Sequence, residues 1–230
     1  MIKPKPIFIA WNCHNLSASR LNALQLFASQ TRPLAISLTE IRLSPNSRAP
    51  KIAGYSTYFK PVSRSSCGSL MFVADCFLGT PVSHRRREEL ECSAHFLCVE
   101  VKFAWRSASL LLASVYHHRT ESSLAGSAWI KLKKSLSCLS RSCSDFICAG
   151  DFNCHDNSWN TVRQDSFGAD LASFCSDHSI TVLNSIFCPG QPTFPSSGSV
   201  IDLALCSSPA LVSEMLPLHD SPLDSDHFPL

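Results

Sequence analysis

The sequence predicts a mixed α/β domain in which helices pack outside layered β-sheets, and three observations support this fold class. Short apolar runs with the lengths of buried strands alternate along the chain with helical patterns. Apolar residues make up 45% of the 230 residues, which is enough to build a hydrophobic core. No internal repeat and no linker rich in Gly, Ser or charge divides the chain, so we expect a single domain over residues 1–230.

The first half of the chain is expected to form a strand, a helix and then several strands. Residues 7–12 are a short apolar run that ends at polar residues, which indicates a buried strand. Ser17 can cap a following helix, whose apolar positions recur at helical spacing at Leu21, Leu24, Phe27 and Ala28. Loops are expected around a short segment at residues 55–59. The other expected strands are residues 34–38, 70–73, 96–103 and 109–116.

The second half of the chain is expected to add two helices and three strands. Residues 124–139 place Leu and Ala side chains on one face, which is typical of an amphipathic helix, and residues 169–175 carry a second helical pattern. The hydrophilic stretch 81–91 is expected to be a surface connection. The expected strands are residues 146–149, 180–183 and 200–205.

The charge balance leaves the type of partner open, since the formal net charge is only +2. Basic residues cluster at Arg85-Arg86-Arg87 and at Lys131, Lys133 and Lys134, where a solvated surface and a phosphate contact explain the pattern equally well. The apolar runs are far shorter than the roughly 20 residues of a membrane span, and the N-terminus lacks a signal-peptide pattern. We therefore expect an intracellular protein without a membrane partner.

Cysteine usage argues against a zinc site. The chain has 12 cysteines, but they are scattered, often within apolar runs, and no C-x-x-C pair occurs. Together with the missing secretion signal, this pattern predicts reduced thiols that pack as small hydrophobic groups.

Polar residues recur where the expected strands end, at Asn12, Glu40, Tyr116, Asp151, Asn153, Asp202, Asp226 and His227. Taken singly, most of them have a simple explanation as turn caps or surface charges. Asp202 is different because it lies inside the apolar run 200–205, and a carboxylate there is costly to bury unless it is paired. A histidine is the obvious type of partner.

Three segments in order resemble the signature of the endonuclease/exonuclease/phosphatase superfamily, which includes deoxyribonuclease I and the apurinic endonucleases. They are Gly-Asp-Phe-Asn at 150–153, Ser-Val-Ile-Asp-Leu at 199–203 and Ser-Asp-His-Phe-Pro at 225–229. Two earlier motifs of the superfamily are also present, Trp11-Asn12 and residues 38–43. The resemblance implies a four-layer α/β/β/α sandwich, with two packed mixed sheets and the helices outside, as in deoxyribonuclease I.

The resemblance narrows to the endonuclease domain of non-LTR retrotransposon polyproteins. It covers almost the whole chain and includes residues 150–155 followed by Trp159, together with residues 182–185, 191–194 and 222–229. His118 and Asn160 depart from the pattern, because they stand where Pro and Gly are common in that family. The resemblance implies that DNA is the substrate, that a reverse transcriptase normally follows, that the chain stops within its last strand, and that the protein acts in the nucleus.

The resemblance implies metal-dependent hydrolysis of a phosphodiester, which nicks DNA and leaves a 3′-hydroxyl that primes reverse transcription at the target. Glu40 would bind Mg²⁺, with Mn²⁺ as an alternative, and Asn12 and Asp226 would help to place the ion. An abasic-site repair nuclease, another phosphodiesterase of the same fold and a decayed inactive copy are the competing hypotheses.

The same resemblance assigns catalytic roles to five residues. Asp151 would orient or deprotonate the attacking water, and Asn153 would hold Asp151 and the phosphate. His227 would donate a hydrogen bond to a phosphoryl oxygen, while Asp202 accepts from the other ring nitrogen. Tyr116 would contact the phosphate or assist the leaving oxygen, with simple packing as the alternative.

Three further residues are candidates for binding the substrate. His155 and Trp159 could shape a DNA-facing surface or could form a local packing pair. Thr193 could contact the nucleic-acid backbone or could serve as a turn residue after Pro192.

Overall fold

The N-terminal strands form a four-stranded sheet in the computed structural model. The structure describes residues 6–60, 67–81, 96–103, 108–118, 123–124, 126–142, 145–159, 163–221 and 223–230. Its strands are β1 (Phe8–Asn12), β2 (Ala35–Thr39), β3 (Tyr55–Lys60) and β4 (Ser69–Ala74), in the order β1-β2-β4-β3. β1 and β2 are parallel and are joined by helix α1 (Ala18–Thr31), whereas β4 is antiparallel to both of its neighbours.

The rest of the chain forms a six-stranded sheet in the order β5-β6-β7-β8-β10-β9. β7 and β8 are parallel and the other pairs are antiparallel. The strands are β5 (Leu78–Pro81), β6 (Phe96–Lys102), β7 (Leu110–Tyr116), β8 (Phe146–Asp151), β9 (Thr181–Val182) and β10 (Asp202–Cys206). The helices of this part are α3 (Ser127–Ser142), α4 (Ser166–Asp177) and α5 (Asn184–Phe187), with 3₁₀ turns at Pro195–Ser197 and Pro209–Leu211.

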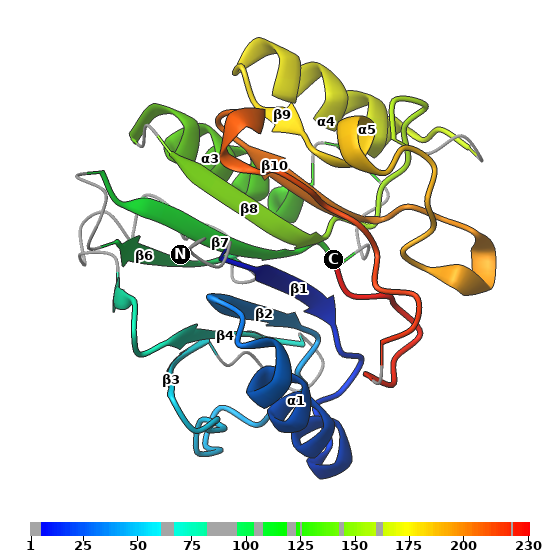
Figure 1. Ribbon diagram of the computed structural model, residues 1–230. Helices are drawn as coiled ribbons and strands as arrows, with labels where there is room; N and C mark the ends of the chain where they lie inside the picture. Colours follow the sequence, from blue (N-terminus) through cyan, green and yellow to red (C-terminus); the bar gives the residue numbers. More distant parts are fainter. Residues whose placement is uncertain are drawn as a thin grey trace.

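The two sheets pack face to face, with α1 outside one and α3 and α4 outside the other (Figure 1). The side-chain alternation of β8 shows how the strands divide the core. Phe146 and Cys148 point into the apolar cluster under α3 and α4, whereas Ile147 and Ala149 point into the cluster between the sheets. Both faces of this strand are therefore buried, and the four-layer α/β/β/α architecture is confirmed.

The expected helices and strands are present, with small shifts at their ends. Ser17 caps α1 as predicted, because its side chain accepts a hydrogen bond from the backbone N–H of Arg20. Strand β5 and helix α5 were not predicted, and the remainder of the expected surface connection, with Arg85-Arg86-Arg87, lies outside the described residues. Asp202 is the first residue of β10 rather than an interior one, although it is still buried.

Two other sequence expectations can be compared with the structure. Eight of the ten cysteines in the described ranges are buried, and none of these ten forms a disulfide, in line with the prediction of reduced, packed thiols. Among the helices that the structure describes, none combines the length and apolar character needed to cross a membrane.

Candidate active site

Strand register places Asp151, Asp202 and Tyr116 side by side at the ends of three neighbouring strands of the six-stranded sheet. Asp151 ends β8 and lies directly opposite Asp202, which begins β10. On its other side Asp151 is paired with Tyr116, the last residue of β7. Because directly opposed residues point to the same face of a sheet, the two carboxylates and the phenol converge without any contribution from long loops.

Asp202 and His227 form a buried hydrogen-bonded pair. The Asp202 Oδ2 atom lies 2.7 Å from His227 Nδ1, and the two residues are only 3% and 6% exposed. Burial lowers the pKa of His227, but the charge and hydrogen bond of Asp202, with smaller effects of Asp151 and Asp226, outweigh it and raise the pKa to about 9. The ring is therefore held in one orientation, with Nε2 turned toward the rest of the site.

A buried hydroxyl group fixes the start of β10. The Oγ1 atom of Thr193 accepts hydrogen bonds from the backbone N–H groups of Ile201 and Asp202, at 3.1 and 3.0 Å. In addition, Phe228 donates its backbone N–H to the Thr193 carbonyl at 2.8 Å. Thr193 thus ties together the two segments that carry the aspartate and the histidine of the pair.

Asp151 is surrounded by amide donors. The backbone N–H of Asn153 donates to Oδ1 at 2.8 Å, and the side-chain amides of Asn153 and Asn12 both donate to Oδ2 at 3.0 Å. Asn153 adopts φ +48°, a left-handed conformation that Asn tolerates better than most residues and that turns its side chain back onto Asp151. Burial, followed by repulsion from Asp202, raises the pKa of Asp151 well above the usual range, although His227 and these hydrogen bonds oppose the shift.

Asn12 joins the two sheets at this site. Its side-chain Nδ2 donates to Glu40 Oε1 at 3.1 Å and to Asp151 Oδ2 at 3.0 Å, and it lies 3.5 Å from His227 Nε2. A single amide at the end of β1 therefore touches the predicted metal ligand, the predicted base and the predicted phosphate donor. This contact set explains why a fully buried Asn stands at the end of an apolar strand.

Glu40 follows β2 and is held as a carboxylate. Burial raises its pKa, but hydrogen bonds from Asn12, Arg42 and Tyr116 outweigh this effect and lower the pKa below the usual range. The contact with Arg42 is an ion pair of 2.8 Å to Oε2. Glu40 itself adopts φ +51°, so the chain turns sharply after the strand and directs the side chain into the site.

His14 lies between two of the predicted metal ligands, a position that the sequence did not indicate. Its Nδ1 atom is 3.8 Å from Glu40 Oε2 and 3.7 Å from Asp226 Oδ2, and the side chains of His14 and Asp226 are 46% and 43% exposed. The only hint in the sequence is that His14 stands two residues after Asn12. Asp226 thus faces this exposed histidine, whereas its neighbour His227 pairs with the buried Asp202.

The three residues predicted to bind substrate lie inside the molecule. Thr193 is 0% exposed, Trp159 1% and His155 2%. Trp159 belongs to the apolar cluster under α3 and α4, and the ring of His155 contacts Arg163. Their burial favours the packing alternatives over a contact with DNA, because a side chain must reach the surface to touch a duplex.

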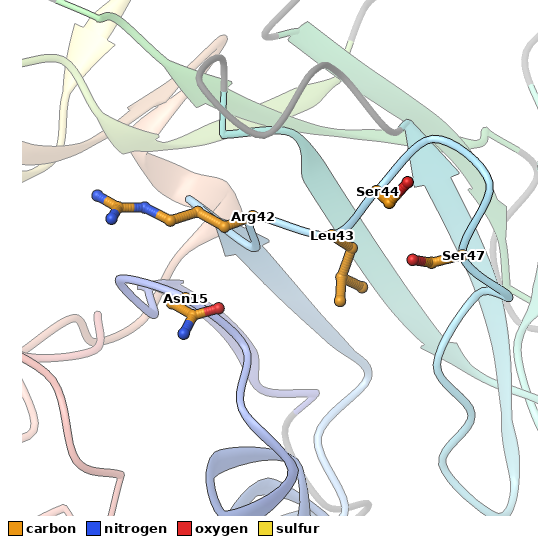
Figure 2. Close-up of a pocket in the computed structure, with 5 residues that line it drawn as sticks. All are labelled: Asn15, Arg42, Leu43, Ser44 and Ser47. Carbon is orange, nitrogen blue, oxygen red and sulfur yellow. The ribbon is translucent and has the colours of Figure 1, made fainter.

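A cavity of about 420 Å³ lies at the segment that follows β2 (Figure 2). It is lined by Asn15, Arg42, Leu43, Ser44 and Ser47. Arg42 belongs both to this cavity and to the ion pair with Glu40. Arg42 is therefore the residue that links the cavity to the predicted metal ligand.

Two sets of side chains could hold a metal ion. Asp151, Asp202 and His227 each offer an atom within 4.8 Å of the others, but the Asp202 and His227 atoms are already committed to each other at 2.7 Å. Glu40 and Asp226 offer carboxylate oxygens of the kind that Mg²⁺ prefers, and the pKa of Glu40 is lowered. These oxygens are also engaged, since Glu40 Oε2 is paired with Arg42 and Asn12 turns its Nδ2 group toward Glu40 Oε1.

A comparison with protein families identifies the family of the chain. The family model described as endonuclease-reverse transcriptase matches residues 110–230, which is more than half of the chain. No protein with a curated description matches the chain.

Solved structures of nucleases share the fold. One is the endonuclease domain of TRAS1, a telomere-specific non-LTR retrotransposon, with a TM-score of 0.73 and 16% identity over 98% of this chain and 96% of that one. Another is the AP endonuclease LMAP from Leishmania major, with a TM-score of 0.74 and 16% identity over 96% and 85% of the two chains. A third is the catalytic domain of Xenopus laevis APE2, with a TM-score of 0.68 and 14% identity over 96% and 89%.

Proposed function

Because the chain belongs to the endonuclease-reverse transcriptase family, we propose that it is a metal-dependent endonuclease that nicks DNA and leaves a 3′-hydroxyl. In a non-LTR element that hydroxyl would prime reverse transcription at the target. The description of the matching family model, which names a reverse transcriptase, favours this assignment over other activities of the same fold, and the TRAS1 endonuclease domain shares that fold. The partners of the domain would then be target DNA and a reverse transcriptase encoded in the same polyprotein.

One observation carries the proposal, namely that a single amide touches three groups that hydrolysis of a phosphodiester requires. Asn12 contacts Glu40, Asp151 and His227, which come from three distant segments of the chain. A carboxylate suited to a divalent cation, a carboxylate suited to a base and a cationic imidazole thus lie around one amide.

Asp151 is proposed to take the proton of the attacking water. Its raised pKa makes its carboxylate a stronger base than an ordinary aspartate, and Asn12 and Asn153 hold that carboxylate in a fixed orientation. Asn153 also donates its backbone N–H to Asp151 Oδ1, so the residue that orients the base is itself held beside it.

His227 is proposed to donate a hydrogen bond from Nε2 to a phosphoryl oxygen. With a pKa of about 9 the ring is a cation at neutral pH, and Asp202 occupies its other nitrogen. Tyr116, whose hydroxyl contacts Glu40 and whose pKa is raised well above its usual range by burial and by Glu40, keeps its proton and can donate to the phosphate or the leaving oxygen.

Glu40 is proposed to hold Mg²⁺ or Mn²⁺, with Asn12 and Asp226 contributing to the same site. When bound, the cation would neutralise the negative charge that gathers on the phosphoryl and leaving oxygens. The amide of Asn12 would keep Glu40 and Asp151 in register, so that the charge and the base act on the same phosphate.

Nicking of supercoiled plasmid by the purified chain tests the proposal. We expect nicking with Mg²⁺ and none with EDTA, and the nick should support extension by a DNA polymerase, which requires a 3′-hydroxyl. Asp151→Asn should slow nicking by about 10³-fold, since it removes the base but keeps the shape of the side chain. The matched control is Asp177→Asn, an exposed position at the end of α4, which should nick like the parent.

Two outcomes would contradict the proposal. If Asp151→Asn nicks as fast as the parent, the base has been assigned to the wrong residue. If an oligonucleotide with an abasic site is cut far faster than intact DNA, the chain is a repair-type nuclease, as the likeness to LMAP would then suggest.

A further inference from the structure

We propose that His117 is a positioning residue for the catalytic turn, by which we mean Asp151, Phe152 and Asn153. The inference rests on the proposed function, because it assumes that Asp151 is the base. It goes further by adding a buried histidine that none of the sequence motifs indicated, and by naming the peptide unit through which this histidine acts.

His117 forms a hydrogen bond with each of the three residues of the catalytic turn. Its backbone N–H donates to the Asp151 carbonyl at 2.8 Å, and its own carbonyl accepts from the side-chain amide of Asn153 at 3.1 Å. Its ring atom Nδ1 lies 3.0 Å from the carbonyl oxygen of Phe152. Because a carbonyl oxygen can only accept, Nδ1 must carry a proton and donate it. The side chain of His117 therefore fixes the direction of the middle carbonyl of the turn.

This hydrogen bond orients the peptide unit between Phe152 and Asn153. The C=O and N–H groups of a trans peptide share one plane and point in opposite directions. With the Phe152 carbonyl held toward His117, the Asn153 N–H is turned the other way, where it donates to Asp151 Oδ1 at 2.8 Å. Asn153 has a left-handed backbone with φ +48°, a conformation that persists only where surrounding contacts enforce it. His117 provides one of those contacts.

The ring of His117 is itself held by aromatic side chains of two outer helices. Its centroid lies 4.8 Å from that of Trp129 on α3 and 5.4 Å from that of Phe167 on α4. The residue is only 3% exposed. A buried ring with close neighbours has little freedom to move, so the direction of its Nδ1–H group is fixed as well. The helices outside the six-stranded sheet thus help to orient the base through His117.

Two substitutions separate positioning from simple packing. His117→Phe keeps a ring beside Trp129 and Phe167 but removes the donor, whereas His117→Asn removes the ring but keeps a donor, because its Nδ2 atom is as many bonds from the backbone as Nδ1. If His117 positions the base, kcat for nicking should fall about tenfold or more in His117→Phe, with KM for DNA unchanged. His117→Asn should restore most of that loss. If His117→Phe nicks with the parental kcat, the inference is rejected.

A second histidine offers a matched control. The Nδ1 atom of His178 lies 3.0 Å from the Phe174 carbonyl oxygen at the C-terminal end of α4, so it makes the same kind of hydrogen bond at the same distance. His178→Phe should therefore remove an equivalent bond outside the site and leave kcat unchanged. An equal fall in kcat for both variants would mean that the effect is a general one, and it would overturn the role of His117.

A double-mutant cycle shows whether the effect passes through the base. In the Asp151→Asn background the base is already lost, so His117→Phe should slow nicking by less than about twofold more. If the two losses multiply instead, His117 acts elsewhere and the inference fails. This cycle decides the question even where His117→Asn does not fold.

Hydrogen exchange of the Asn153 backbone amide, followed by NMR on the full chain without DNA, tests the inference separately from nicking. This amide should exchange at least about tenfold faster in His117→Phe than in the parent, while the amide of Ala149 in β8 keeps its rate, since only the turn is released. Unchanged exchange at Asn153, or equal acceleration at both amides, would contradict the inference.

The outcome is separable from that of the proposed function. If the parent nicks plasmid and His117→Phe nicks equally well, the endonuclease assignment is supported and the role of His117 is rejected. If the parent does not nick but the Asn153 amide is protected only when His117 is present, the positioning of the turn is supported and the nuclease is rejected.

Discussion

The two halves of the candidate site are built in opposite ways. The dyad half, consisting of Asp151, Asp202 and His227, is almost fully buried and contains a hydrogen bond of 2.7 Å. The cation half carries the predicted metal ligands Glu40 and Asp226; His14 lies 3.8 and 3.7 Å from their carboxylates, and the side chains of His14 and Asp226 are 46% and 43% exposed. Strand register positions Asp151 and Asp202 in the first half, whereas Glu40 and the nearby His14 have left-handed backbone conformations.

This difference suggests that the protein itself satisfies the charges of the dyad half, whereas a bound ion would complete the cation half. Buried charges must be satisfied within the protein, so the dyad half is complete as it stands and contributes to the stability of the fold. Exposed carboxylates can stand apart at little cost, so the cation half can leave room for an ion. Changes in the dyad half should therefore lower stability as well as activity, whereas changes in the cation half should alter ion affinity and leave the fold intact.

The largest loss of stability is expected at Gly150, which precedes Asp151. It adopts φ +151°, and a Cβ atom there would lie 2.0 Å from the carbonyl oxygen of Val115 on the neighbouring strand. Gly150→Ala must therefore displace β8 from β7, and we expect a loss of at least about 3 kcal/mol in the free energy of unfolding. Urea denaturation measures the effect.

Gly198→Ala is the matched control for this substitution. Gly198 also has positive φ, +65°, but a Cβ atom there would meet nothing within 4 Å. Only the conformational cost of about 1 kcal/mol should remain. Equal losses for both variants would show that the close approach to Val115 does not constrain the site.

The charge of His227 should make stability depend on pH. Its pKa is about 9 in the folded protein against 6.5 for an ordinary histidine, so the folded state binds the proton more tightly. The stabilisation is fully present below pH 6.5, is lost as the pH rises through 9, and amounts to as much as about 3 kcal/mol. The parent and His227→Gln should be compared by urea unfolding in EDTA between pH 6 and 9. A difference between them that does not change with pH would show that the pair with Asp202 is not charged.

Substitutions of Thr193 test whether its side chain positions the Asp202–His227 pair or contacts DNA. Thr193→Val removes the acceptor for two buried N–H groups, which should cost about 2 kcal/mol of stability and weaken nicking through Asp202. Thr193→Ser keeps the hydroxyl and loses one methyl group, at a cost of about 0.8 kcal/mol. Weaker DNA binding by Thr193→Val with unchanged stability would favour the contact with the nucleic-acid backbone instead.

The strand framework and the dyad half were largely predictable from the sequence, because apolar runs end abruptly at the polar residues that matter. Asp202 illustrates this, since a carboxylate beside an apolar run requires a partner and a histidine was the expected type. The family resemblance pointed to His227, and the structure shows that pair. The four layers followed from the family resemblance, whereas the alternation of strands and helices predicted only a layered α/β domain.

The cation half was only partly predictable, because its geometry depends on the backbone of loops. His14 lies near Glu40 and Asp226 because its own backbone is left-handed and Arg20 donates to its carbonyl, and neither feature has a sequence signature. Strand β5 was not predicted because it is a short edge strand that ends at a proline. Burial likewise separates Thr193, Trp159 and His155 from the surface, which a motif match alone does not reveal.

The smallest expected effect on stability, at Arg42, completes the contrast between the halves. Arg42 is paired with Glu40 Oε2 at 2.8 Å, but its side chain is 40% exposed, so Arg42→Gln should change the free energy of unfolding by less than about 1 kcal/mol. Because the guanidinium competes with a cation for Glu40, its removal should lower the Kd for Mn²⁺ by about two- to fivefold. Lys131→Gln on α3 removes the same charge at an exposed position and controls for net charge. Weaker binding of Mn²⁺ by Arg42→Gln alone would mean that Arg42 orients Glu40 for the ion, and the cation half would then be as fully organised in advance as the dyad half.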